Sequence, residues 1–218
     1  MIIILATILC DIKSNILFKY LISIFLISFV SLLLIAQPDI GQTLLVVFCW
    51  SVLIFTSGIN IYILLAIFIA GASLLTYLII YVPRFDYIQG RIFSFFNRET
   101  GTHNFQSDKA IESITSGGFF GKGIGEGVLK NRVPEAHTDY IISVISEEFG
   151  VVAIMLILLL FLILIYMVFK KISFETNDKV KLILIGSISL ILMQATIHVG
   201  VNIRLFPTTG MTLPFLSY

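Results

Sequence analysis

Long apolar runs separated by short polar links dominate this chain. Five runs are long enough, or nearly so, to cross a bilayer, whose core of ~30 Å needs about 20 helical residues. They cover roughly residues 17–36, 44–57, 61–82, 151–169 and 180–203, and the run at 44–57 is the shortest. The pattern predicts an all-α fold, a polytopic bundle of membrane helices that forms one domain over 1–218.

A polar stretch from about residue 83 to residue 140 separates the third and fourth runs. A structureless loop of this length is uncommon in a folded domain, so we expect it to contain helices. Phe85, Ile88, Ile92 and Phe95 recur at three- and four-residue steps, which predicts a short amphipathic helix, either at the membrane interface or simply on the surface. A second helix is expected at about 106–116, along the membrane surface.

Lysines predict the orientation of the bundle. They flank the first polar link and crowd the link between the last two runs (Lys13, Lys19, Lys170, Lys171, Lys179, Lys181), whereas the turn at 37–41 has no basic residue. Basic links stay in the cytoplasm of a membrane protein. Counting crossings then puts both the turn at 37–41 and the loop at 83–140 on the extracytoplasmic side.

Composition agrees with a membrane protein, because 58% of the residues are hydrophobic and only 12% are charged. The net charge of +1 gives no basic excess that would favour nucleic acid as a partner. Cys10 and Cys49 lie in apolar runs without a CxxC or Cys/His pattern, so we interpret them as packing residues.

Glycines gather at residues 117–127, GGFFGKGIGEG. A P-loop requires a glycine five residues before its Gly-Lys and a Ser or Thr after it, but Ser116 and Gly123 occupy those positions. Two interpretations remain. The segment brings main-chain N–H groups and Lys122 to a diphosphate, or it is a turn that only reverses the chain.

Three ionisable residues, Glu135, His137 and Asp139, stand where the polar loop returns to the membrane. An acid at that boundary is partly desolvated, and such groups are functional candidates. The three could share a metal ion. A hard cation held by substrate phosphates would need only one or two carboxylates, however, so we expect no metal site built by the protein alone. His137 and Thr138 are interpreted first as capping and packing residues.

Other polar side chains interrupt apolar segments. Glu147 and Glu148 face a polar cavity or pair with a base such as Arg204. Asp39 is interpreted first as the entrance of a helix and second as a substrate contact. The last run carries a polar stripe, which predicts hydrogen bonds to a neighbouring helix or, second, a cavity wall (Gln194, Thr196, His198, Asn202).

Residues 117–150, GGFFGKGIGEGVLKNRVPEAHTDYIISVISEEFG, resemble the loop and following helix of the SEDS family of peptidoglycan glycosyltransferases. The Pro-Glu-Ala-His-Thr-Asp core at 134–139 is closer to the division-type (FtsW-like) branch than to the elongation (RodA) branch. Further matches are QPDIGQT at 37–43, the pair Tyr87 and Arg91 before Phe95-Phe96-Asn97, and PTTGMTLPFLSY at 207–218.

The resemblance implies an enzyme of the bacterial cytoplasmic membrane that polymerises lipid II into glycan strands at the division septum. Its implied partners are a class B penicillin-binding transpeptidase and other membrane proteins of the divisome. The aspartate of the family's His-Thr-Asp motif falls on Asp139, which is the implied general base. A divalent cation, Mg²⁺ or Mn²⁺, would help the diphosphate leave. Five further residues are expected to bind substrate: Lys122, Arg91, Glu135, His137 and Asp39.

Two other functions fit the same pattern. Polar helix faces around a cavity would also suit a flippase that transports lipid II, and a non-catalytic divisome scaffold is the third candidate. Family members begin with further spans and a Pro-Ser-Glu-x-x-x-Lys type segment, and they continue past Ser-Tyr into Gly-Gly-Ser-Ser and a last helix. We therefore expect this chain to be truncated at both ends, which leaves open whether it is active by itself.

Overall fold

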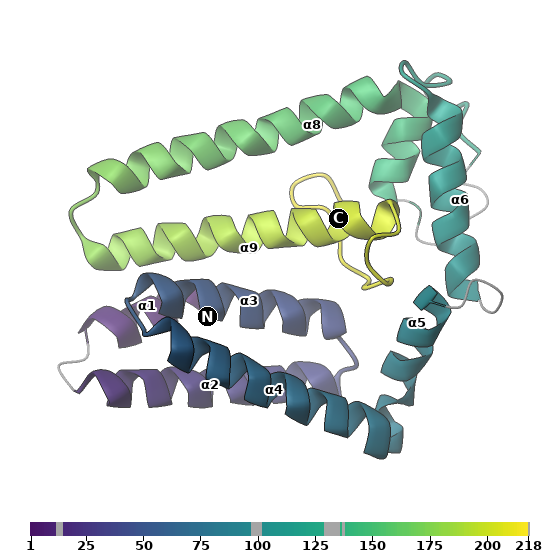
Figure 1. Ribbon diagram of the computed structural model, residues 1–218. Coiled ribbons are helices and arrows are strands. Elements are labelled where there is room, and N and C mark those ends of the chain that lie inside the picture. The colour runs from purple at the N-terminus through teal and green to yellow at the C-terminus, as the bar shows by residue number, and fades with distance from the viewer. Residues whose placement is uncertain (12–14, 97–101, 129–135, 137, 218) are drawn as a thin grey trace. The chain divides into compact units, whose positions relative to one another are not determined.

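A computed structural model describes residues 1–11, 15–96, 102–128, 136 and 138–217 (Figure 1). The regular elements of these residues are all helical. They are α1 (Ile2–Asp11), α2 (Ile16–Ala36), α3 (Ile40–Thr56), α4 (Ile61–Tyr81), the 3₁₀ helix η1 (Pro83–Phe85), α5 (Asp86–Phe96), α6 (Thr102–Gly117), α8 (Ile141–Phe174) and α9 (Asp178–Asn202). The predicted all-α class is confirmed.

Four of the described helices are long and apolar enough to cross a membrane, namely α2, α4, α8 and α9. They match the predicted runs at 17–36, 61–82, 151–169 and 180–203. Many of their large apolar side chains are exposed, such as Phe25 and Tyr62, as expected for helices that face lipid. The chain is therefore a polytopic membrane protein.

Helix α3, which holds the short run at 44–57, begins at Ile40 and is an apolar helix of 17 residues. It starts earlier than predicted because Asp39 caps it, with Oδ1 accepting a hydrogen bond of 2.9 Å from the Gln42 N–H. The predicted role of Asp39 at a helix entrance is confirmed. Helix α4 ends where Val82 turns extended before Pro83, since the residue before a proline disfavours helical backbone.

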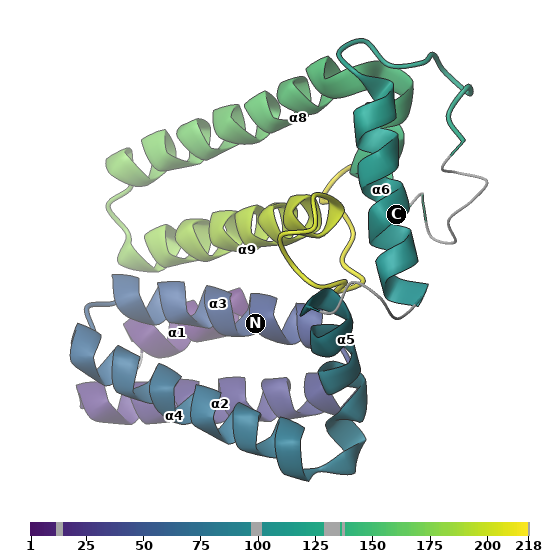
Figure 2. The same cartoon turned by 45° about the vertical axis from the view of Figure 1, so that its right-hand side comes forward.

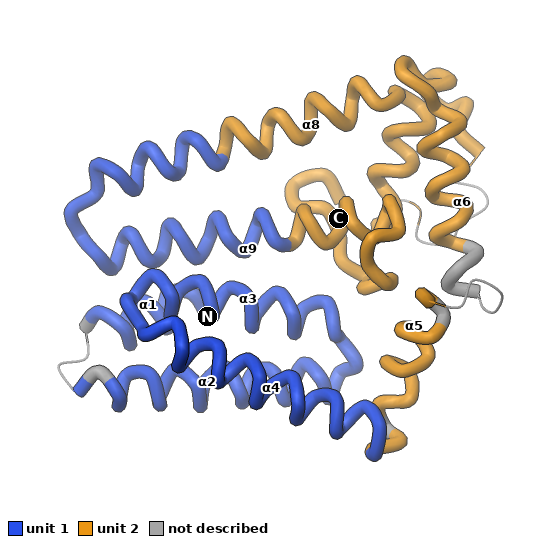
Figure 3. Tube along the Cα trace, viewed as in Figure 1, with its two compact units in different colours: residues 1–81, 165–193 blue, residues 82–164, 194–218 orange. Residues whose placement is uncertain are grey.

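The chain forms two compact units (Figure 3). Unit 1 comprises 1–81 and 165–193, and unit 2 comprises 82–164 and 194–218. The boundary passes through α8 and α9. The single domain expected over 1–218 stays a prediction.

The core of unit 1 packs α1, α2 and α3 around Trp50, Leu53 and the buried Cys49. The Cys49 thiol lies 3.4 Å from the carbonyl of Gly186 on α9, and a methyl group at Gly186 would lie 2.8 Å from a side-chain carbon of Ile2. Cys49 is buried in this core and Cys10 packs against it, which confirms their predicted role in packing.

In unit 2, α6 lies beside the first part of α8, as both Figures 1 and 2 show. The expected helices at 85–96 and 106–116 are confirmed as α5 and α6, and α6 extends to 102–117. A small core joins α8, α9 and the C-terminal segment, residues 204–217, through Ile142, Ala195 and Leu213. This unit holds most of the predicted site residues.

Candidate functional site

Asp139 lies in a turn directly before α8, where it is half-buried. Its carboxylate is beside the main chain of Gly210, because a methyl group placed at Gly210 would lie 3.9 Å from Asp139 Oδ2. Gly210 has a φ of +71°, a conformation that side-chain-bearing residues rarely adopt. The glycine therefore permits the path of the C-terminal segment, while the distance to the carboxylate is an ordinary van der Waals contact.

Asn202 at the end of α9 fixes the main chain at Asp139. The amide is fully buried, and its Nδ2 donates to the carbonyl of Asp139 (3.0 Å) and to that of His198 (2.9 Å). Its Oδ1 accepts from both the main-chain N–H (3.2 Å) and the hydroxyl (2.8 Å) of Ser143. Both amide hydrogens and the amide oxygen are used, so the turn is held rigidly to α9 and α8.

Two more residues of the polar stripe on α9 bind the C-terminal segment. His198 Nδ1 donates to the carbonyl of Met211 at 2.8 Å, and Gln194 Nε2 donates to that of Thr212 at 2.9 Å. The predicted helix–helix hydrogen bond is confirmed for Asn202, which reaches α8. Gln194 and His198 instead position an irregular segment, an arrangement that the spacing alone did not predict.

The same segment brings Arg91 toward the site. Arg91, on α5, donates through Nη1 to the carbonyl of Thr208 at 3.3 Å, two residues before Gly210. At the far end of the segment, the Ser217 hydroxyl donates to the carbonyl of Thr138 at 3.2 Å. Two of the predicted site residues, Arg91 and Asp139, thus contact one short stretch of chain.

Helix α8 is broken at Gly150, whose φ of 80° and ψ of 179° lie outside helical space. A helix break leaves carbonyls without partners on one side and N–H groups without partners on the other. The glycine-rich segment supplies partners for both sets of groups. The N–H groups of Lys122 and Gly123 donate to the carbonyls of Glu147 (2.9 Å) and Glu148 (3.1 Å).

On the other side of the break, the N–H groups of Val151 and Val152 donate to the carbonyls of Gly118 (3.0 Å) and Phe119 (3.3 Å). Side chains would prevent this contact. A methyl group at Gly121 would lie 2.2 Å from the Glu148 carbonyl oxygen, and one at Gly150 would lie 2.2 Å from that of Phe119. The glycines allow two backbones to pair, and the N–H groups of Lys122 and Gly123 are not available to a diphosphate.

The Lys122 side chain pairs with Glu147, with Nζ 3.1 Å from Oε1. The Val128 N–H donates to the same oxygen at 3.0 Å, and the Glu147 side chain is only 3% exposed. A polar cavity of about 220 Å³ adjoins the pair and reaches Lys109 and Glu112 on α6. Of the two roles predicted for Glu147, both the polar cavity and a basic partner are present, but that partner is Lys122.

Arg204, the base suggested from the sequence as a partner of the two glutamates, forms an ion pair with Asp108 on α6. Glu147 lies eight residues beyond Asp139 in the chain, which is about 12 Å along a helix at 1.5 Å per residue. The pair of Lys122 and Glu147 is therefore a separate feature from the Asp139 turn, and the substrate role predicted for Lys122 stays a prediction.

Three of the predicted site residues do not contribute to the described arrangement around Asp139. Glu135 and His137 lie outside the described residues. Asp39 belongs to unit 1, where it caps α3, and its role as a substrate contact stays a prediction. Within the described parts of the chain, no group of three or more His, Cys, Asp or Glu side chains could hold a metal ion.

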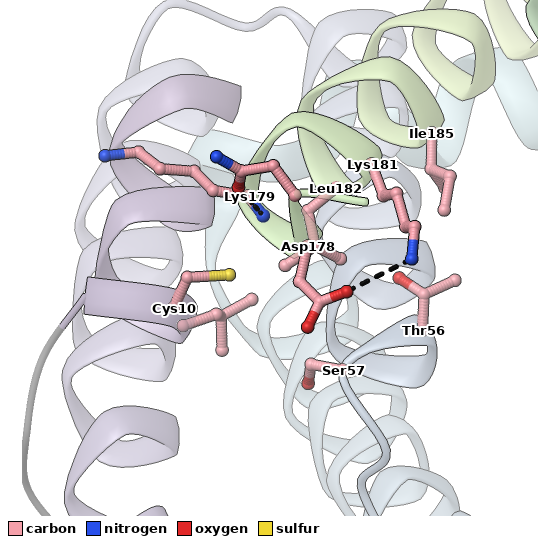
Figure 4. A pocket seen from close by; sticks show the side chains of 10 residues that line it. Cys10, Thr56, Ser57, Asp178, Lys179, Lys181, Leu182 and Ile185 are labelled. Carbon is pink, nitrogen blue, oxygen red and sulfur yellow. Dashed lines mark hydrogen bonds and ion pairs between the residues drawn. The ribbon is translucent and has the colours of Figure 1, made fainter. Parts of the chain in front are cut away.

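Unit 1 contains a cavity of about 580 Å³ between the ends of α1, α3 and α9 (Figure 4). Cys10, Thr56 and Ser57 line one part of it, and Lys181 pairs with Asp178 across another at 3.3 Å. None of the predicted site residues lines this cavity. The chemistry predicted from the sequence therefore concentrates in unit 2, at the Asp139 turn.

Comparison with known proteins identifies related sequences. The FtsW/RodA/SpoVE family, described as cell cycle proteins, matches residues 1–218. A protein of Caulobacter vibrioides named "Probable peptidoglycan glycosyltransferase FtsW" is 35% identical over 201 residues, 89% of this chain and 49% of its own length. Proteins with the same name from Francisella salina and Enterococcus hirae are 37% and 30% identical, covering 88% and 92% of this chain.

The chain spans about half the length of these curated relatives, between 49% and 54%. A solved structure described as "Structural coordination of polymerization and crosslinking by a peptidoglycan synthase complex" has a TM-score of 0.78 to this chain. It is 24% identical, and the match covers all of this chain and 62% of the other. At this identity the match supports the fold alone.

Proposed function

Since the chain belongs to the FtsW/RodA/SpoVE family of cell cycle proteins, we propose that it forms the catalytic membrane part of a peptidoglycan glycosyltransferase. The enzyme polymerises lipid II into glycan strands during division. The names of the relatives support this activity, and the fold of a multi-pass membrane protein suits a lipid-linked substrate. The reaction takes place at the extracytoplasmic boundary, where the loop at 83–140 lies in this proposal.

In the proposed reaction, Asp139 acts as a general base. Its carboxylate takes the proton of the acceptor sugar's 4-hydroxyl as that oxygen forms a bond to the anomeric carbon of the donor. The bond between this carbon and the undecaprenyl diphosphate breaks, and the diphosphate leaves with the electron pair. A positioned base of this kind contributes about 10²–10⁴-fold to a rate.

The observation that carries the proposal is the rigid turn around Asp139. Asn202 holds the carbonyl of Asp139, and Ser217 holds that of Thr138, while Asp139 as a residue is half-buried with its carboxylate beside Gly210. A general base must stand within hydrogen-bond reach of the proton that it removes, so a main chain fixed on both sides of the carboxylate suits this role.

The leaving diphosphate needs positive charge near it. Arg91 is the better placed of the two proposed cations, because it binds the segment that passes Asp139. A guanidinium has five N–H donors, so the contact with Thr208 leaves others for phosphate oxygens. The Lys122 ammonium is engaged by Glu147, which favours a structural role for it.

A divalent cation would add positive charge to the leaving diphosphate. Magnesium is commonly held by substrate phosphates with one or two carboxylates. The described residues offer no cluster of three or more ligands, so a Mg²⁺ or Mn²⁺ ion would be bound mainly by the substrate phosphates. The proposed protein partners are a class B penicillin-binding transpeptidase and other divisome membrane proteins.

The test is Asp139→Asn, assayed for polymerisation of purified lipid II in proteoliposomes. It is made in this chain and in the aspartate of the His-Thr-Asp motif of a full-length relative. We expect the initial rate to fall about 10²–10⁴-fold because the amide cannot accept the proton. Asp178→Asn, at an exposed residue at the start of α9, is the matched control and should polymerise at the original rate.

Polymerisation by Asp139→Asn at the original rate would refute the base assignment. The two other functions predict different results. A flippase would move lipid II across the vesicle membrane without forming glycan strands, and a scaffold would support division with or without the carboxylate. Gel separation of the glycan products, together with a transport assay on the same vesicles, distinguishes the three.

A further inference from the structure

Three large apolar side chains stand exposed on the glycine-rich segment. Phe119, Phe120 and Ile124 are 75%, 86% and 80% exposed, although the segment belongs to no membrane helix. We call these three residues the apolar tip. Exposed apolar residues that gather on a loop mark a site of contact with another apolar surface. The question is which surface covers the tip.

The backbone pairing at the break of α8 sets the level of the tip in the membrane. Gly118 and Phe119 accept hydrogen bonds from the N–H groups of Val151 and Val152, which are the first residues after the break. From Val151 to Lys170 is 19 residues (170 − 151), or about 28 Å at 1.5 Å per residue. This rise nearly matches a bilayer core of ~30 Å.

Lys170 begins the charged end of α8, so its ammonium belongs at one lipid–water boundary. Val151 then lies at the other boundary, and the tip that is hydrogen-bonded to it lies at the same level. The lipid-facing surface of α8 begins here as well, since Val152, Met155 and Leu156 are each more than half exposed. The tip therefore adjoins a surface that already faces lipid.

Charged groups around the tip permit only shallow burial. Lys122 lies between Phe120 and Ile124 in the sequence, but its ammonium turns toward Glu147, 3.1 Å away. Glu126 follows two residues after Ile124 and is exposed. A carboxylate is costly within the hydrocarbon core, so it would stop insertion near the headgroups.

We propose that the apolar tip inserts into the bilayer at the boundary between headgroups and acyl chains, and so anchors the glycine-rich segment to the membrane. The occupant of this surface is lipid. Because the segment is paired with both sides of the helix break, the anchor also holds the two parts of α8 at a fixed depth. The first of these parts begins directly after Asp139.

The experiment measures the depth of a tryptophan at the tip. The sequence has a single tryptophan, so Trp50→Phe provides a background without tryptophan fluorescence, and Phe120→Trp adds the reporter. The chain is reconstituted in phosphatidylcholine vesicles whose acyl chains carry bromine at a shallow or a deep position. We expect a blue-shifted emission that shallow bromines quench more strongly than deep ones.

Two control positions bracket this result in the same background. Ile69→Trp, in the middle of α4 and 69% exposed, should be quenched most by the deep bromines. Thr176→Trp, exposed in the link between α8 and α9, should show the red-shifted emission of water and little quenching. Emission at position 120 like that at position 176 overturns the proposal.

Blue-shifted emission at position 120 without quenching by either lipid also overturns it, because the tip would then be covered by protein, such as a second copy of the chain. Should Trp50→Phe fail to fold, a nitroxide at Phe120→Cys in a Cys10→Ser, Cys49→Ala background gives the same depth from its collisions with oxygen and a water-soluble nickel complex. A nitroxide that meets only the nickel complex contradicts the anchor.

Discussion

Gly150→Ala tests the pairing of the glycine-rich segment with the broken helix α8. Two separate costs arise at this residue. An alanine would have to adopt a φ of 80° with a ψ of 179°, a region that is essentially restricted to glycine. Its methyl group would also lie 2.2 Å from the carbonyl oxygen of Phe119 and 2.6 Å from the Gly121 nitrogen.

The free energy can be worked out from these two costs. Backbone strain of this kind costs about 1–3 kcal/mol. To reach ordinary contact at 3.4 Å, the Phe119 carbonyl must retreat by 1.2 Å (3.4 − 2.2), which breaks its 3.3 Å bond to Val152. A buried N–H left without a partner costs about 1–3 kcal/mol more. We expect a total of about 4 kcal/mol, a large part of the ~5–15 kcal/mol typical of folded proteins.

Substitutions at three further glycines separate the cost of backbone strain from the cost of the steric clash. Gly118 has a φ of +58° with nothing near its missing side chain, so Gly118→Ala carries strain alone, about 1–2 kcal/mol. Gly117 has no positive φ but would place a methyl group 2.0 Å from the Ser146 carbonyl oxygen, so Gly117→Ala carries the clash alone. Gly90→Ala, exposed within α5, carries neither and should stabilise its helix by about 0.5–1 kcal/mol.

The assay is thermal unfolding of the four variants in one detergent, followed by the loss of the monodisperse peak in size-exclusion chromatography. For a chain of this size, 1 kcal/mol corresponds to about 2–4 °C, so Gly150→Ala should lower the midpoint by roughly 8–16 °C. Gly117→Ala and Gly118→Ala should each fall between it and Gly90→Ala. A midpoint for Gly150→Ala equal to that of Gly90→Ala would refute the proposed pairing of the two backbones.

Two other substitutions test the ion pair of Lys122 with Glu147 and the hydrogen bonds that hold the Asp139 turn. Lys122→Met leaves the carboxylate of Glu147 without its cation and should cost about 2 kcal/mol, less than the ~3–5 kcal/mol of a fully buried pair because the lysine is 38% exposed. Adding Glu147→Gln should recover much of the loss in a thermal melt, whereas lost polymerisation at unchanged stability would assign Lys122 to the substrate instead. Asn202→Ala removes the bonds to Asp139 and Ser143 and should cost about 3 kcal/mol, by the penalty for buried groups without partners. Its polymerisation rate should fall even at temperatures where the fold survives, and an unchanged rate would show that Asp139 needs no such positioning.

The membrane helices could be predicted from the sequence because apolar length alone determines them. The run at 61–82 and helix α4 agree within one residue. Pro83 ends the apolar run in the sequence, and it also ends the helix because it disfavours helical backbone at Val82. The predicted start at 151 marks the break of α8 at Gly150, yet the nine residues before it are also helical. These nine residues are expected to be helical from the resemblance but lie outside the predicted span, because Ser143, Ser146 and the two glutamates interrupt the apolar run.

The candidate site could be predicted only in part. Asp139 stands out because a carboxylate precedes an apolar run. The partner of Glu147 lies 25 residues away in the sequence and that of Arg204 lies 96 residues away. The local sequence around each residue therefore could not show which oppositely charged side chain it pairs with. The contact of Gly210 with the Asp139 carboxylate had no local signal either.

Much of the C-terminal segment is held through its main chain, although the buried Leu213 side chain and the Ser217 hydroxyl also contact the rest of unit 2. Arg91, His198 and Gln194 all donate hydrogen bonds to main-chain oxygens, which every residue has. Substitutions at 208 and 212 should therefore leave these hydrogen bonds in place, whereas Met211 also packs through its own buried side chain. Gly210 differs from these positions, since its φ of +71° would strain any residue that carries a side chain.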